Sequence, residues 1–205
     1  MMSETASVWN FIRKSIFCSH FLKDDTVMIN ARRIVSPEDG LYAECVRIYE
    51  ESFPYEERRD TAEMTKFLSD ARFHFIVFYE GHEADGPAGF FTFWDFGSGY
   101  LYGEHFAVNS AIRGRGTGTA VLDYVKSMDI PMILEIEPPC EDDEMTLRRR
   151  LFYERNGFIL NPYEHVQPAY HEDARPVPMR IMTWPYVFSE EEYMRFRADQ
   201  ISIMP

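Results

Sequence analysis

A glycine-rich loop between a predicted strand and a predicted helix constrains this chain more than any other feature. The run IRGRGTG occupies residues 112–118, directly after a β-rich segment (residues 100–108) and directly before a helical pattern (residues 118–128). Its three glycines stand at alternate positions, which lets the backbone turn tightly and expose successive N–H groups. Such groups, together with the positive end of a helix, form an anion site, and Arg113 and Arg115 add positive charge. The sequence therefore predicts a phosphate or pyrophosphate site.

Two common phosphate-binding motifs do not fit this loop. A P-loop ends in Gly-Lys-Ser/Thr, whereas here Thr119 follows Gly118 and no lysine is present in the run. A dinucleotide fingerprint has the spacing G-x-G-x-x-G, whereas the spacing here is G-x-G-x-G. Taken alone, the loop also fits a tight strand-to-helix turn without a ligand, so other motifs have to decide.

Strands and helices are predicted throughout the chain after residue 26. Alternating and β-rich runs predict strands at residues 27–35, 74–79, 88–95, 100–108, 132–137, 165–170 and 177–184. Helical spacing and caps predict helices at residues 36–53, 61–71, 118–128, 146–156 and 190–198, the last one opened by a capping box of Ser189 and Glu192. This order predicts an α/β (α+β layered) fold around one sheet. We expect an N-terminal extension (1–26), helical by its spacing, a central domain (27–187) and a C-terminal helix (188–205).

Composition narrows the classes of function. The chain has 205 residues, with 21 Lys+Arg against 34 Asp+Glu and a net charge of −13. A protein that follows phosphate backbones should be basic, so nucleic acid is excluded as the main partner. An acidic surface instead favours cationic partners. The longest apolar runs fall well short of a membrane span of about 18 residues, so no membrane partner is expected.

The cysteines and the N-terminal segment give weaker information. Cys18, Cys45 and Cys140 are far apart and form no C-x-x-C pair, which argues against a disulfide framework or a zinc knuckle, and we expect no metal. Free thiols of this kind are typical of the reducing cytoplasm, where we place the protein.

Residues 7–23 carry apolar side chains near helical spacing. This pattern fits a packed extension, a docking helix or a membrane-surface helix. Translation starting at Met28 is a further alternative.

Two motifs in a fixed order resemble one known family. The run HFAVNSAIRGRGTGTAVLDYV is similar to the coenzyme-binding motif of the Gcn5-related N-acetyltransferase (GNAT) family, R/Q-x-x-G-x-G/A, with Arg113, Gly116 and Gly118 at its fixed positions. Downstream, residues 151–158 (LFYERNGF) resemble the aromatic-Tyr-x-x-x-Gly-Phe helix end of the same family. The resemblance covers residues 28–165. The two motifs together, in this order, are more specific than either motif alone.

The resemblance implies a fold and a coenzyme. GNAT members have a single mixed, mostly antiparallel central sheet with flanking helices, and the fourth and fifth strands splay apart around the coenzyme. Residues 27–187 would then form a GNAT-like acetyltransferase domain. The acyl donor is then acetyl-CoA, used as a co-substrate, with no metal. The implied coenzyme-binding residues are Phe106, Ala107, Val108, Arg113, Gly114, Arg115, Gly116, Thr117 and Gly118.

The resemblance also implies catalytic residues for acetyl transfer to a primary amine by direct attack in a ternary complex. Tyr153 stands at the family's tyrosine position, and a phenol can donate a proton to a thiolate. For the base we prefer Glu104, with Glu135 or a water molecule as alternatives. Because adjacent strand residues face opposite ways, Glu104 and His105 are not expected to line the site together, and His105 is expected to be packed.

The acceptor and the partners are less constrained. The acidic balance favours a cationic small molecule or peptide amine. The resemblance implies that residues 51–58 form one wall of the acceptor site, where their acids would attract a cationic amine. Arg148–Arg150 would either reach a coenzyme phosphate or face solvent. A homodimer is the general default for oligomers. Two rival functions remain: a non-catalytic acyl-CoA-binding sensor or interaction module with the same fold, and an acidic α/β domain that binds another phosphorylated ligand.

Overall fold

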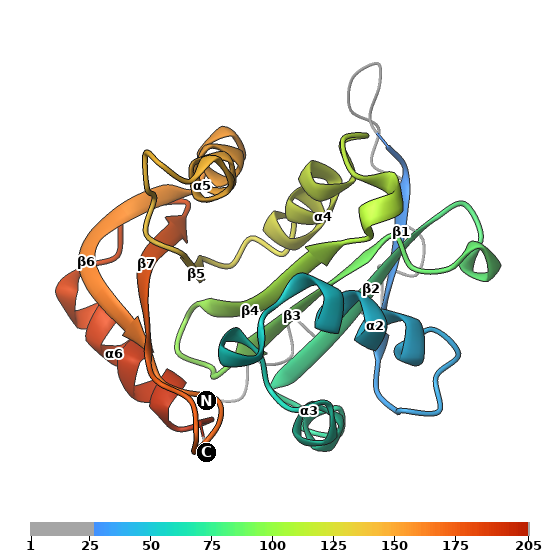
Figure 1. Cartoon of the computed structure of the whole chain (residues 1–205), viewed down its shortest axis with the longest axis horizontal. Helices are drawn as coiled ribbons and strands as arrows, with labels where there is room; N and C mark the ends of the chain where they lie inside the picture. Colours follow the sequence, from blue (N-terminus) through green and yellow to red (C-terminus); the bar gives the residue numbers. More distant parts are fainter. Residues whose placement is uncertain (1–26, 205) are drawn as a thin grey trace.

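The computed structural model describes residues 27–204, and within this range the chain builds one open seven-stranded sheet (Figure 1). The strand order is β1-β2-β3-β4-β5-β7-β6, and only the β4–β5 pair is parallel. This confirms the prediction of a mixed, mostly antiparallel sheet. The strands are β1 (Ile29–Ile34), β2 (Phe73–Glu80), β3 (Gly89–Asp95), β4 (Leu101–Val108), β5 (Met132–Ile136), β6 (Ile159–Gln167) and β7 (Val177–Trp184).

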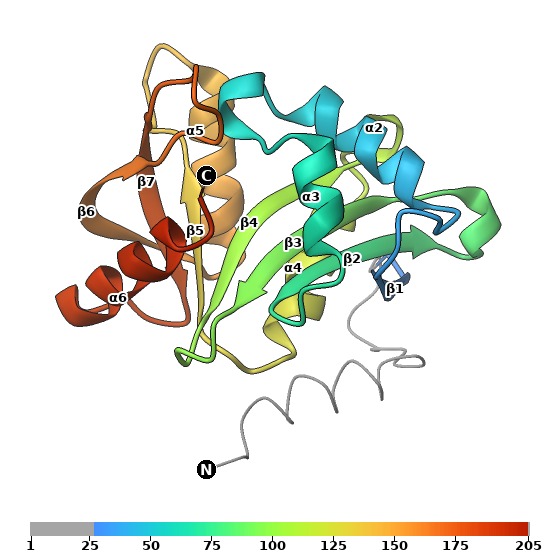
Figure 2. The same cartoon turned by 90° about the horizontal axis from the view of Figure 1, so that it is seen from below.

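Helices cover both faces of the sheet (Figures 1 and 2). On one face α2, α3 and α6 bury side chains such as Tyr49, Met64 and Phe196 in a core with the sheet, and on the other face α4 and α5 bury Val121 and Tyr153 in a second core. Burial on two faces explains the nearly continuous apolar runs of β2 and β3. The helices are α2 (Tyr42–Ser52), α3 (Thr61–Phe67), α4 (Thr117–Lys126), α5 (Glu144–Arg155) and α6 (Glu190–Ile201), with 3₁₀ turns η2 (Tyr55–Glu57), η3 (Glu83–Asp85) and η4 (Ser110–Ile112).

The two central strands separate part of the way along the sheet. β4 pairs with β5 only from Leu101↔Met132 to Gly103↔Leu134, whereas β4 itself continues to Val108. The expected splay between the fourth and fifth strands is therefore confirmed. Beyond Gly103 this edge of β4 has no strand beside it, so every second backbone N–H there points towards the opening.

A β-bulge in β4 overturns one expectation about side-chain directions. In the ladder with β3, Thr92 pairs with His105 and Phe93 pairs with Gly103, which leaves Glu104 as an extra residue. The extra residue breaks the alternation, so Glu104 and His105 point to the same face, with His105 Nδ1 3.8 Å from Glu104 Oε2. The expectation that these neighbours face opposite ways is wrong, because it assumed a regular ladder.

Most element predictions are confirmed, with three differences at the ends. α2 begins at Tyr42 rather than near residue 36, because the Asp39 carboxylate accepts from the Leu41 N–H and turns the chain there first. α3 ends at Phe67, before the expected residue 71. β6 spans Ile159–Gln167 instead of residues 165–170, because an irregularity in its pairing with β7 between Leu160 and Glu164 accommodates Pro162, which suggests a strand break in the sequence.

The ends of the chain are only partly described. The capping box of Ser189 and Glu192 at the start of α6 is confirmed. The predicted helix within residues 7–23, Cys18 and the proposed N-terminal extension lie outside the described residues, and the division into three parts stays a prediction. None of the helices in the described range is long and apolar enough to cross a membrane.

Candidate active site

A cavity of about 640 Å³ lies where β4 and β5 separate. Its walls come from the end of α2, from η2, from β4 and β5, from the glycine-rich loop and from one side of α5. It contains both predicted catalytic residues, Glu104 and Tyr153, and all predicted coenzyme-binding residues except Arg115. The structure thus brings together residues that are up to about a quarter of the chain apart, although it does not test their roles.

The mouth of the cavity is built from the glycine-rich loop. Gly114 and Gly116 have φ values of +84° and +89°, a left-handed conformation that other residues rarely adopt. Gly116 also caps α4, and no side chain accepts a hydrogen bond from the first N–H groups of that helix at this cap. The loop and the helix start therefore present backbone donors to an anion, as the sequence predicts.

Arginines add positive charge around these backbone donors. Arg113, Arg148 and Arg149 all line the cavity. Arg113 Nε donates to the Val108 carbonyl at 3.2 Å, and Arg149 forms an ion pair with Glu137 at the end of β5. Because guanidinium groups bind phosphate oxygens well, this end of the cavity suits a ligand with several phosphates.

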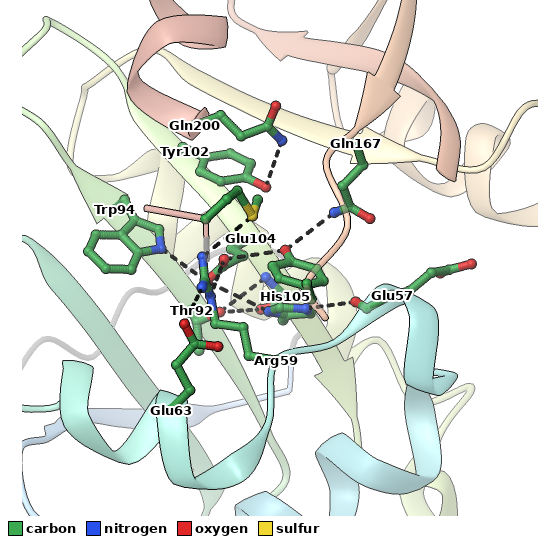
Figure 3. A network of polar contacts seen from close by, with 12 residues as sticks. Glu57, Arg59, Glu63, Thr92, Trp94, Tyr102, Glu104, His105, Gln167 and Gln200 are labelled. Carbon is green, nitrogen blue, oxygen red and sulfur yellow. Dashed lines mark hydrogen bonds and ion pairs between the residues drawn. The ribbon is translucent and has the colours of Figure 1, made fainter. Parts of the chain in front are cut away.

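The opposite end is acidic, and several donors hold Glu104 there (Figure 3). Arg59 Nε donates to Glu104 Oε1 at 2.9 Å, Trp94 Nε1 donates to Oε2 at 3.0 Å, and the Tyr170 hydroxyl donates to Oε1 at 3.3 Å. Burial on its own would raise the pKa of Glu104, but Arg59, His105 and the hydrogen bond from Trp94 hold the pKa below its usual value. Glu104 is therefore a fixed anion in this structure.

Arg59 is the counter-ion of this site, and nearly its whole side chain is buried (1% exposed). Its guanidinium carbon lies 5.0 Å from the centre of the Phe67 ring and 4.9 Å from that of the Tyr170 ring, so aromatic faces take the place of water. Glu63 adds a second ion pair at 3.4 Å. The positive charge is thereby held beside Glu104 without access to bulk solvent.

Glu135, the alternative base, is also saturated by hydrogen bonds. The Tyr102 hydroxyl donates to Glu135 Oε2 at 2.6 Å, and His165 Nε2 lies 2.5 Å from Oε1. Gln200 from α6 and Gln167 from β6 donate at 2.9 and 3.3 Å. Both oxygens of this carboxylate are occupied, so Glu135 links β5 to β4, β6 and α6.

His105 and Tyr153 occupy the wall between the two ends. His105 is buried, and burial lowers its pKa, so the imidazole is neutral; its Nε2 lies 3.0 Å from the Glu57 carbonyl oxygen and donates to it. Tyr153, on α5, is also buried, and burial raises its pKa to about 12. A phenol with this pKa keeps its proton throughout the neutral range, as a proton donor requires.

Several residues of the site were not found from the sequence. Arg59, Gln167 and Gln200 come from three separate segments and meet only in the folded chain. Arg59 stands in the charged run EERRD, which is typical of a solvent-exposed turn. No local pattern distinguishes it from Arg58, whose side chain is more exposed. Among residues 27–204, no group of three or more His, Cys, Asp or Glu side chains is arranged to hold a metal ion.

A sheet that opens between two parallel central strands, with a glycine-rich loop at the mouth of the opening, is typical of the acyl-CoA N-acyltransferase class of fold. Comparison with known proteins agrees. Residues 71–160 match the model of the acetyltransferase (GNAT) domain. A solved GNAT acetyltransferase structure from Bacteroides thetaiotaomicron is 32% identical, covers 83% of this chain and 94% of its own, and superposes with a TM-score of 0.73.

One further relative and one solved structure of the same fold are more distant. The Bacillus subtilis (strain 168) protein YjbC, whose name specifies an acetyltransferase but no substrate, is 29% identical over 150 residues, which are 70% of this chain and 72% of YjbC. A Bacillus subtilis acetyltransferase solved in complex with CoA shares the fold at 12% identity, with 76% of this chain and 97% of its own covered and a TM-score of 0.51. The chain belongs to the GNAT family, and it is an acyltransferase.

Proposed function

We propose that this protein transfers the acetyl group of acetyl-CoA to a primary amine by direct attack in a ternary complex. One observation carries the proposal: a single cavity joins an end rich in backbone donors and arginine to an end rich in carboxylates, and the two ends meet along β4. A donor with a diphosphate and an acceptor with a positive charge would meet there. The solved Bacillus subtilis neighbour with bound CoA supports the choice of coenzyme.

The proposed coenzyme site uses the residues that the sequence singled out. The N–H groups of residues 113–118 would hold the diphosphate, with Arg113 and Arg115 adding charge, and the N–H groups of Phe106–Val108 that face the opening would stabilise the oxyanion of the thioester carbonyl. Tyr153 would give its proton to the departing sulfur. Two cysteines, the buried Cys45 and the exposed Cys140, are unpaired, which supports the proposed cytoplasmic location.

The contacts of Glu104 favour a role other than that of the base, which the sequence analysis preferred for it. Its two oxygens already accept from Arg59, Trp94 and Tyr170, and its lowered pKa makes it a weak proton acceptor. These contacts favour a positioning role, in which Glu104 fixes the shape and the negative potential of the acceptor end. A negative potential there favours a cationic amine over an acidic one.

Thermal shift followed by an amine panel tests the proposal. Saturating acetyl-CoA, at about 100 times its Kd, should stabilise the protein by about 2.7 kcal/mol. Spermidine, ethanolamine and a peptide with a free α-amino group then serve as acceptors, and release of the CoA thiol reports transfer. We expect transfer to at least one cationic amine. A thermal shift without transfer would favour a non-catalytic acyl-CoA sensor, and no shift would remove the coenzyme from the proposal.

A further inference from the structure

The η2 turn contributes a carboxylate to the cavity that differs from all the others. Five glutamates line the cavity, and four of them are engaged: Glu104 and Glu135 as described, Glu51 with Arg47, and Glu137 with Arg149. The side chain of Glu57 has no hydrogen bond or ion pair with any residue of the range 27–204. It is therefore the cavity carboxylate whose oxygens are available to a ligand.

The surroundings of Glu57 suit a proton acceptor. The side chain is half-buried, and burial raises its pKa, which Arg149 of α5 opposes and which Glu56 of η2 and Glu135 of β5 reinforce. A carboxylate with a raised pKa takes a proton more readily than an ordinary glutamate. His105 of β4 is neutral and contacts only the backbone of this turn, so it adds no opposing charge.

The turn that carries Glu57 is fixed to the strand at the centre of the site. His105 Nε2 donates to the Glu57 carbonyl oxygen at 3.0 Å (Figure 3), and the Arg59 N–H donates to the Tyr49 hydroxyl at 2.7 Å. The β4 bulge is what turns His105 to this face. These contacts hold Glu57 at a constant position relative to β4, where the thioester would lie.

Arg149 affects the pKa values of both Glu57 and Tyr153, the proposed acid. Its charge lowers both pKa values. Arg149 and Tyr153 both stand on α5 and line the cavity, and Glu57 lines the same cavity from η2. The cavity thus holds a carboxylate and a phenol on separate elements.

We propose that Glu57 is the catalytic base that removes a proton from the acceptor ammonium. The proposal rests on the proposed function. In the step, Glu57 takes one proton from R–NH₃⁺, and the nitrogen lone pair forms the C–N bond to the thioester carbon. The C–S bond then breaks, and Tyr153 gives its proton to the sulfur while it recovers one from the new amide nitrogen. The products are the amide and the CoA thiol, with one proton released through Glu57.

The matched variants are Glu57→Gln and Glu172→Gln. Glu172 is exposed to solvent, does not line the cavity and does not affect the pKa of Glu57, so its variant removes the same charge without touching the site. At pH 7 we expect kcat/KM for the best amine of the panel to fall by about 100-fold or more in Glu57→Gln, the usual loss for a general base. Glu172→Gln should stay within about 2-fold, and both should keep the thermal shift with acetyl-CoA.

The pH profile separates a base from a structural residue. In the wild type, kcat/KM should decline at acid pH as Glu57 becomes protonated, and Glu57→Gln should lack this decline. The defect of Glu57→Gln should shrink as rising pH deprotonates the amine without help. A defect below about 3-fold, or one that stays constant up to pH 10, would overturn the assignment of Glu57 alone, whereas a wild type that acetylates no amine would overturn the proposed function together with it.

Discussion

The two ends of the cavity are built in different ways. The coenzyme end uses backbone N–H groups from one short loop, and Gly114 and Gly116, both with positive φ, make its geometry attainable. The acceptor end uses buried side chains from the connection between η2 and α3 and from β3, β4, β5, β6 and α6, and Arg59 pairs with Glu104 among them. A site made of backbone is local in sequence and tolerant of surrounding side chains, whereas a site made of charged side chains depends on the whole fold.

Removal of the counter-ion tests the acceptor end most severely. Arg59→Met keeps an apolar stem but leaves Glu104 buried without its ion partner, and we expect the free energy of unfolding to fall by about 3–5 kcal/mol. Urea unfolding measures it. Arg47→Met, which breaks the exposed ion pair with Glu51, should cost below about 1 kcal/mol. Equal losses in both variants would show that burial of the pair has no special importance.

A substitution in the loop should instead affect binding. Gly116→Glu places a side chain at φ +89° and a negative charge beside the proposed diphosphate, so we expect acetyl-CoA affinity to fall by about 100-fold, or about 2.7 kcal/mol. Gly97→Glu is the control, since Gly97 has φ +71° in the β3–β4 turn and open space around it. Both variants should lose about 1–2 kcal/mol of stability from the strained backbone. Titration calorimetry would contradict the comparison if Gly97→Glu weakened binding equally.

Tyr153 lies between the two ends, and its substitution should change the rate rather than binding or stability. Tyr153→Phe removes the phenol proton, and we expect kcat to fall by about 30-fold with KM little changed. The loss is smaller than for a typical general acid because a thiolate, with a free pKa of about 8.5, is a good leaving group. Steady-state kinetics with acetyl-CoA measures it. An unchanged kcat would remove Tyr153 from the chemistry and leave it as a packed side chain.

His74 shows what a buried titratable group does without a counter-ion. It lies in β2, stacked on Phe93, and burial lowers its pKa to about 3. Its unfolded pKa is about 6.5, so the unfolded chain binds the proton first, and stability present above pH 6.5 is lost as the pH falls towards 3. We expect about 1 kcal/mol of this loss at pH 5.5, and His74→Phe should abolish it. Urea unfolding at pH 8 and pH 5.5 measures this loss in the wild type and in His74→Phe. An equal pH dependence of stability in the two proteins would contradict the assignment of the loss to His74.

The same contrast explains which features the sequence could predict. The glycine loop, Gly157 after α5 (φ +85°) and the capping box before α6 all depend on local backbone conformation, and each was predictable from neighbouring residues. The coenzyme end of the cavity followed from these signals and from the resemblance to a family.

The acceptor end was not predictable in this way. Arg59 and Glu104 are 45 residues apart, and their pairing depends on how η2 packs on β4. The bulge at Glu104 depends on the register of β3, which alternation within β4 does not encode. For the same reason the continuation of β6 through Pro162 became visible only once its pairing with β7 was known.

The bulge in β4 also bears on how related chains should be aligned. Because of it, this strand offers one side chain more to the acceptor than a regular strand of the same length would. Deletion of a single residue there would restore alternation and move either the carboxylate or the imidazole through the sheet to the α4 side. A relative that shares the glycine loop but lacks the extra residue should therefore bind the same coenzyme and select a different amine.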